Sequence, residues 1–198
     1  MPRPKAHDEA LRARLLEQAG ETLSTQGLAA LSLRRLAADT GTSTTAVYAL
    51  FGGKQPLLRA VLDEAFRRLG AHLQRVAPSP DPLEDVVALG LAHRDSALAD
   101  PHLYDVMFGG LQVGPPDATS AEAAAAVFDP LRRIVDRAAG AGLLRSGADP
   151  ATATLAIWAV VHGLVTTQLH GSGPATEGDP KVVFETVLRA SVAGWCVG

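Results

Sequence analysis

The segment from residue 32 to residue 54 constrains the fold of this chain most, because it combines two short helical patterns with a glycine between them. In the first pattern, Leu33, Leu36 and Ala37 share one face of a helix. Gly41 follows the last apolar position, where a helix needs a left-handed residue in order to stop. The layout predicts a helix-turn-helix of the kind that binds DNA.

The second helix of this segment has one apolar face and one face of small or hydrogen-bonding residues. The inner face is formed by Val47, Leu50 and Phe51. The opposite face is formed by Thr44, Thr45, Tyr48 and Ala49. Because these outer side chains are small or polar, we expect the helix to lie close to a base-pair edge or a phosphate.

The composition indicates a globular, cytoplasmic protein. Of the 198 residues, 47% are hydrophobic and 20% are charged, which is enough for a core in one large or two small domains. The only cysteine is Cys196, so no disulfide framework and no Cys/His metal spacing is expected. Residues 1–8 lack the apolar stretch of a signal peptide. We therefore expect neither a metal nor a cofactor.

Charge is divided unevenly along the chain. Residues 1–75 carry 11 Lys and Arg against 7 Asp and Glu, a net charge of +4. Residues 76–198 carry 7 against 14, a net charge of -7. A basic end on an acidic body suits a protein that presents one end to a polyanion, although drift in composition would give the same division.

Helical periodicity runs through the whole chain, which predicts an all-α fold of about nine helices. Besides the two helices above, they are expected at residues 8–26, 54–76, 83–99, 101–108, 120–141, 150–170 and 181–196. We expect a three-helix DNA-binding domain over residues 1–53. A helical effector-binding and dimerisation domain is expected over residues 54–198.

The helix over residues 150–170 is apolar on nearly every side. No charged residue lies between Asp149 and Glu177, so length alone would allow a membrane span. Its Thr, Gln and His residues argue against a membrane and for burial on both sides. Since the final helix is similarly apolar, the last two helices are expected to form a homodimer interface.

Residues 8–58 resemble the N-terminal domain of the TetR/AcrR family of transcriptional regulators. The resemblance is carried by the run from Gly27 to Ala37, the Gly-Thr-Ser-Thr turn, the run from Ala46 to Phe51, and Lys54 followed by Pro-Leu-Leu. Residues 100–109 and 158–163 resemble a C-terminal subtype of that family named for a Trp-His-Gly signature. The resemblance implies a homodimer whose recognition helices enter the major grooves of a palindromic operator. A small molecule would tilt the fourth helix and release the DNA.

The same resemblance assigns DNA contacts. The expected set is Ser32, Arg34, Thr42, Ser43, Thr44, Thr45, Ala46, Tyr48, Ala49 and Lys54. Tyr48 and Lys54 match phosphate-contacting positions, although a packing aromatic and a solvated helix start explain them as well. Ser32 is expected to cap the first helix of the pair. Because the recognition helix lacks Asn, Gln and Arg, we expect phosphates and DNA shape to supply much of the binding.

Two further features have more than one explanation. The basic residues Arg3 and Lys5 suit a tail that touches DNA, or a solvated one. A mostly apolar effector pocket is expected from Phe66, His93, Tyr104, Met107, Phe108, Leu111, Trp158, His162 and Thr166. Plain core packing explains each of these pocket residues as well.

No catalytic pattern is present, because the chain lacks a phosphate-binding glycine loop, a nucleophile elbow and paired carboxylates in a catalytic spacing. The sequence thus favours a ligand-responsive transcriptional repressor over an enzyme. The alternative is a DNA-binding accessory or structural protein whose second domain is packed and binds no effector.

Overall fold

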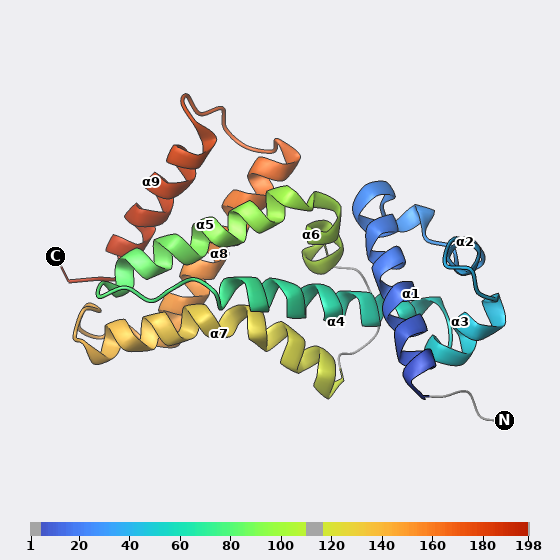
Figure 1. Cartoon of the computed structure of the whole chain (residues 1–198). Helices are drawn as coiled ribbons and strands as arrows, with labels where there is room; N and C mark the ends of the chain where they lie inside the picture. Colours follow the sequence, from blue (N-terminus) through green and yellow to red (C-terminus); the bar gives the residue numbers. More distant parts are fainter. Residues whose placement is uncertain (1–4, 110–116, 198) are drawn as a thin grey trace. The chain divides into compact units, whose positions relative to one another are not determined.

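The computed structural model describes residues 5–109 and 117–197 of the chain, and within these ranges helices are joined by turns and loops (Figure 1). The helices are α1 (Lys5–Gln26), α2 (Leu33–Asp39), α3 (Thr44–Phe51), α4 (Lys54–Leu73), α5 (Pro82–Ala99), α6 (Pro101–Phe108), α7 (Ala118–Gly140), α8 (Pro150–His170) and α9 (Pro180–Ala193). A 3-10 turn, η1, covers Leu28–Ala30. Within the described ranges, the only β feature is an isolated bridge between Leu144 and Cys196. The expected all-α fold with nine helices is confirmed.

The chain forms two compact units. The first contains residues 1–68 and 100–124, and the second contains residues 69–99 and 125–198. The first unit is larger than the expected domain over residues 1–53. The expected boundary at residue 53 was drawn where the helix-turn-helix motif ends, whereas the two units are defined by packing. The expected domain boundary therefore stays a prediction.

The first unit is built on the apolar stripe of α1. Leu11, Leu15, Ala19 and Leu23 recur at every fourth position, and all are buried. They share one core with buried residues of the following helices, namely Leu36, Ala37, Val47, Phe51, Leu57, Leu58, Val61, Leu62 and Val106. Each fully buried leucine contributes about 1.5–3 kcal/mol relative to an exposed one, so this core fixes α2 and α3 on α1.

In the second unit, the end of α4 packs closely against α7 at Gly70 and Ala126. A β-carbon built at Gly70 would lie 2.9 Å from the backbone carbon and oxygen of Ala126. The neighbouring atoms belong to backbone and cannot rotate away, so only glycine fits at this position. Position 70 therefore sets the separation of the two helices.

Helices α8 and α9 each bury one stripe and expose another. In α8 the buried residues are Ala153, Ile157, Val161 and Val165, and in α9 they are Phe184, Leu188 and Val192. By length and composition α8 could cross a membrane, but a single helix of this kind is weak evidence for a membrane protein. Within the chain, 22% of its apolar window is buried. The expected burial on both sides is thus found on one side only within a single chain.

Candidate nucleic-acid interface and ligand-binding region

The turn between α2 and α3 has the geometry that the sequence predicts. Gly41 adopts a φ of 68°, in the left-handed region that favours glycine. Its N–H donates to the carbonyl of Ala38 at 3.1 Å, and the N–H of Thr42 donates to the carbonyl of Ala37 at 2.8 Å. These bonds satisfy carbonyls at the end of α2 and turn the chain into α3.

The two serines that precede α2 and α3 behave differently. Ser43 is the N-cap of α3, and its hydroxyl accepts a hydrogen bond from the N–H of Ala46 at 3.1 Å. Ser32 holds the N-cap position of α2, but its side chain makes no capping bond. The expectation that the Ser32 side chain caps α2 is therefore wrong, although the residue is exposed at the N-cap position.

Tyr48 and Lys54 flank one tight turn. Gly52, with a φ of 80°, ends α3 by donating from its N–H to the carbonyl of Tyr48 at 2.8 Å. A β-carbon at Gly53 would be in van der Waals contact with the Tyr48 ring, 3.9 Å from Cε1. The Tyr48 side chain thus lies against the turn with 53% of its surface exposed. Lys54, the first residue of α4, is exposed at the other end of the turn.

The remaining expected contacts lie around α3 with different exposures. Arg34, Ser43, Thr45 and Ala49 are exposed, whereas Thr42 and Thr44 are half-buried. Ala46 is half-buried and packs against the core of the first unit. Val47 and Phe51 are buried and Leu50 is half-buried, so the expected inner face of α3 is confirmed. The DNA-contacting roles of the outer residues stay predictions.

The arginines near the turn differ in what they contact. Arg34 is exposed, while Nε of Arg35 lies 3.7 Å from a carboxylate oxygen of Asp39 on the same helix. Sequence reasoning did not single out Arg12, whose guanidinium lies 5.3 Å from the centre of the Phe51 ring. No local pattern links these two residues, because they are far apart in the sequence. Arg3 lies outside the described residues.

The expected pocket residues divide between the two units. Phe66, Tyr104, Met107 and Phe108 belong to the first unit. The ring of Phe66 meets that of Phe108 edge-on at 5.5 Å, and Tyr104 lies 4.7 Å from Phe108, centre to centre. Met107 packs against the core of this unit. Leu111 lies outside the described residues.

The other expected pocket residues lie in the second unit, where two of them form a stack. The ring of Trp158 stacks on His162 at 5.1 Å and meets Phe128 edge-on at 5.3 Å. His93 is buried beside Trp158, and both line a cavity of about 30 Å³. Burial, with repulsion from His162, lowers the pKa of His93 to about 4, so this histidine is neutral at physiological pH. Burial also lowers the pKa of His162. Thr166 is half-buried on the same helix.

This cavity is large enough for about one water molecule and too small for an effector of ordinary size. A larger cavity of about 320 Å³ lies between α4, α5 and α7 in the same unit. Its lining includes Asp85, Arg133 and Arg137, none of which stands out in the sequence. The burial of Asp85 in the first turn of α5 becomes visible only in the structure, so no signal in the sequence could have drawn attention to the cavity.

Known proteins match both parts of the chain. Residues 15–61 match the family model of bacterial regulatory proteins of the tetR family, and residues 86–191 match the tetracyclin repressor-like C-terminal domain. The Trp-His-Gly subtype stays a prediction. HTH-type transcriptional regulator Rv1816 of Mycobacterium tuberculosis is 28% identical over 217 aligned positions, which cover 93% of this chain and 92% of that protein.

Two solved structures share the fold over nearly the whole chain. A protein with unknown function from Rhodococcus sp. RHA1 is 30% identical with a TM-score of 0.80, covering 94% of this chain and 96% of its own. The regulatory protein SCO4313 is 26% identical with a TM-score of 0.75, covering 98% of this chain and 100% of its own. The family models and these relatives show that the chain belongs to the TetR family of bacterial regulatory proteins and is a DNA-binding transcriptional regulator.

Proposed function

We propose that this regulator is a cytoplasmic repressor that binds a palindromic operator as a homodimer and releases it when a small molecule binds. The observation that carries the DNA-binding half is the turn formed by Gly52 and Gly53. It holds the exposed ring of Tyr48 and the exposed ammonium group of Lys54 at the two ends of one short connection. A phenol and an ammonium group so placed can both donate to phosphate oxygens of one DNA strand.

The outer face of α3 supports a binding mode in which phosphates supply much of the affinity. Thr45 and Ala49 are exposed there, and neither side chain can form a bidentate bond to a base. Arg34 on α2 is exposed and makes none of the ion pairs found within the described residues. Arg34 is therefore the best candidate for a base contact near this helix.

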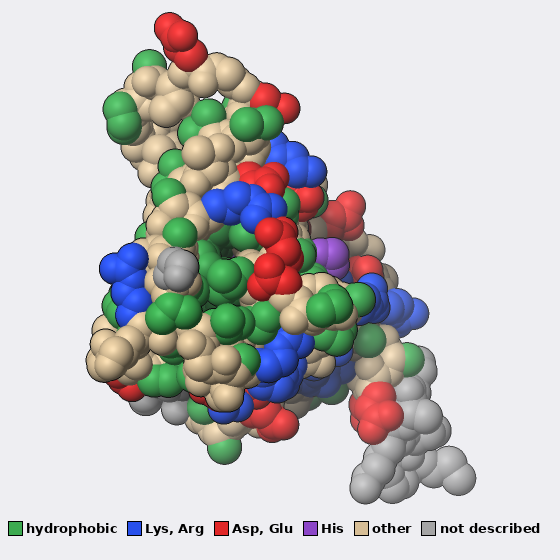
Figure 2. All heavy atoms as spheres, turned by 90° about the vertical axis from the view of Figure 1, so that its left-hand side faces the viewer, with side chains coloured by type: hydrophobic (Ala, Val, Ile, Leu, Met, Phe, Trp, Pro, Cys, Tyr) green, Lys and Arg blue, Asp and Glu red, His purple; other side chains and the backbone are tan. Residues whose placement is uncertain are grey.

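The exposed stripes of α8 and α9 support a homodimer. Leu155 of α8 is 63% exposed, and Val182 and Val187 of α9 are 60% and 40% exposed. On the face that carries α9 and the C-terminus, hydrophobic side chains reach the surface between charged ones (Figure 2). A second copy of the chain covering these stripes would remove the apolar surface from water.

A second candidate is a DNA-binding accessory protein that responds to no effector. It is favoured by the small size of the cavity beside His93, since about 30 Å³ leaves the interior there almost completely packed. The two candidates differ in one measurable property, because only the repressor loses DNA affinity when a small molecule binds to it.

Selection of duplexes from a random-sequence library by the full-length protein tests the DNA-binding proposal. We expect the enriched duplexes to contain an inverted repeat that reflects the two-fold symmetry of a dimer. Enrichment of sequences without symmetry would contradict a palindromic operator. A thermal-shift screen of small molecules then separates the candidates: compounds that stabilise the protein and also weaken duplex binding support the repressor.

A further inference from the structure

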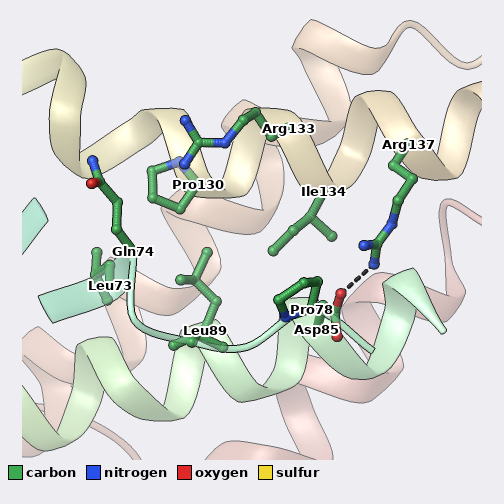
Figure 3. A pocket seen from close by; sticks show the side chains of 10 residues that line it. Leu73, Gln74, Pro78, Asp85, Leu89, Pro130, Arg133, Ile134 and Arg137 are labelled. Atoms are coloured by element: carbon green, nitrogen blue, oxygen red, sulfur yellow. Dashed lines mark hydrogen bonds and ion pairs between the residues drawn. The ribbon is translucent and has the colours of Figure 1, made fainter. Parts of the chain in front are cut away.

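The cavity of about 320 Å³ has an apolar interior. It lies between the C-terminal end of α4, the segment that leads into α5, α5 itself and α7 (Figure 3). Leu73 and Leu89 are almost completely buried at its base, and Ile134 points into it from α7. Its volume falls within the range of sites that bind small molecules.

One end of the cavity is closed by a structural ion pair. Arg137 donates to the carboxylate of Asp85, and the N–H of Ser79 donates to the other carboxylate oxygen at 2.8 Å. Burial alone would raise the pKa of Asp85, but the hydrogen bond from Ser79 and the nearby Arg137 together lower it. Asp85 therefore stays charged at neutral pH, and this end of the cavity is electrically balanced.

The lining of the cavity also includes a second cation, Arg133. Arg133 on α7 places its guanidinium beside Pro130, and Gln74 follows the end of α4; both line the cavity (Figure 3). No carboxylate within residues 5–109 and 117–197 forms an ion pair with Arg133. With two arginines and one aspartate, the lining has a net charge of +1.

We propose that this cavity binds an organic anion in which one carboxylate is attached to a compact apolar body. Arg133 and Gln74 offer several N–H donors, which suit the two oxygens of a carboxylate. Leu89 and Ile134 offer the apolar surface for the body of the molecule. The inference rests on the proposed function, because it assigns the site and the chemical class of the effector.

The position of this cavity suits an effector. Leu73 and Leu89 also line the smaller cavity beside His93, so one pair of side chains separates the two. Leu73 is the last residue of α4, the helix that begins at Lys54. A ligand that displaces Leu73 thus acts on a helix whose other end carries an expected phosphate contact.

Calorimetric titration of the full-length protein with acids and their amides tests the inference. The probes are phenylacetate, hexanoate and cyclohexanecarboxylate, each compared with its uncharged amide of nearly equal shape. We expect at least one acid to bind about tenfold or more tightly than its amide, because a hydrogen bond to a charged group is lost with the carboxylate. Equal affinity for every acid and amide, or no binding of any acid at millimolar concentration, would overturn the proposal.

Two variants locate the site, and a third variant serves as a control. Arg133→Gln should lower the affinity for the acid about tenfold and leave the affinity for the amide unchanged. Ile134→Phe should lower the affinity for both the acid and the amide, because the larger side chain fills the apolar part of the cavity. Arg132→Gln removes the same charge from the same helix, but at a residue that pairs with Asp129 and Asp136 outside the cavity, so it should change neither. An Arg133→Gln variant that binds the acid like the wild type would overturn the assignment.

Duplex binding measured on the same preparations separates this inference from the proposed function. If the wild type binds its selected duplex but none of the acids, the site is wrong and the DNA-binding proposal stands. If an acid binds as expected but no duplex is enriched, the site stands and the DNA-binding proposal is wrong. If an acid binds without changing duplex affinity, the effector role is overturned.

Discussion

The guanidinium of Arg12 on α1 lies 5.3 Å from the centre of the ring of Phe51, the last residue of α3. The contact joins the first helix of the chain to the end of the expected recognition helix. A cation over an aromatic face at an exposed site contributes about 0.5–1 kcal/mol. We predict that Arg12→Met, which keeps most of the side-chain volume, lowers the free energy of unfolding by that amount in urea denaturation. Arg14→Met, on the same helix, should leave it unchanged.

Lys54 and Tyr48 should affect DNA affinity in different ways. Lys54→Gln is predicted to weaken binding to all duplexes and to reduce the slope of log affinity against log salt by about one for each protomer of the bound dimer. Tyr48→Phe removes a hydroxyl but no charge, so affinity should fall while the slope stays the same. Fluorescence anisotropy over a series of salt concentrations measures both, and Lys181→Gln on α9 is the matched control. A wild-type salt slope in Lys54→Gln would rule out its phosphate contact.

The two N-cap serines allow an internal comparison. Ser43→Ala removes a hydroxyl that accepts from the N–H of Ala46, so the free energy of unfolding should fall by about 1 kcal/mol. Ser32→Ala removes a hydroxyl without a capping bond and should cost clearly less. Chemical denaturation of both variants measures the two free energies of unfolding. An equal decrease in both variants would contradict the difference in capping.

Asp85 should make stability depend on pH. Because its pKa is lower in the folded than in the unfolded protein, its stabilisation is present above the unfolded pKa and is lost as pH falls through the folded value. Asp85→Asn is predicted to lower the free energy of unfolding by about 2 kcal/mol at neutral pH, since hydrogen bonds to a charged group are weakened. The loss should shrink as pH falls below about 3.9. A loss that is the same at every pH would show that the charge contributes nothing.

The exposed stripes of α8 and α9 predict a dimer at micromolar concentration. Replacement of Leu155 or Val182 by glutamate places a charge on the apolar surface and should shift the protein toward a monomer. Val197→Glu, at a position that is 52% exposed near the C-terminus, controls for the added charge. Sedimentation velocity distinguishes the species, and a monomeric wild type would refute the proposed interface.

Local rules in the sequence predicted the helices and the turn. The left-handed turn at Gly41 and the inward direction of Val47 and Phe51 follow from spacing and from the freedom of glycine. The predicted Ser32 cap was wrong, because a serine at the N-cap position does not guarantee the rotamer that makes the capping bond.

Features that depend on distant residues were not predictable. The pairing of Asp85 with Arg137 and the contact of Arg12 with Phe51 join positions with no common pattern. The expected pocket residues were chosen for being apolar or aromatic, a property they share with ordinary core residues. They accordingly fall into an aromatic cluster in one unit and a stack in the other.

The contact at Gly70 determines which motions are available to the end of α4. Since the backbones of Gly70 and Ala126 touch, sliding between α4 and α7 would meet a steric barrier at that crossing. We therefore expect α4 and α7 to move together at this crossing when either helix is displaced. Gly70→Ala adds one methyl group at the crossing and should force α4 and α7 apart, so this substitution separates the packing of the two helices from every other property of the site.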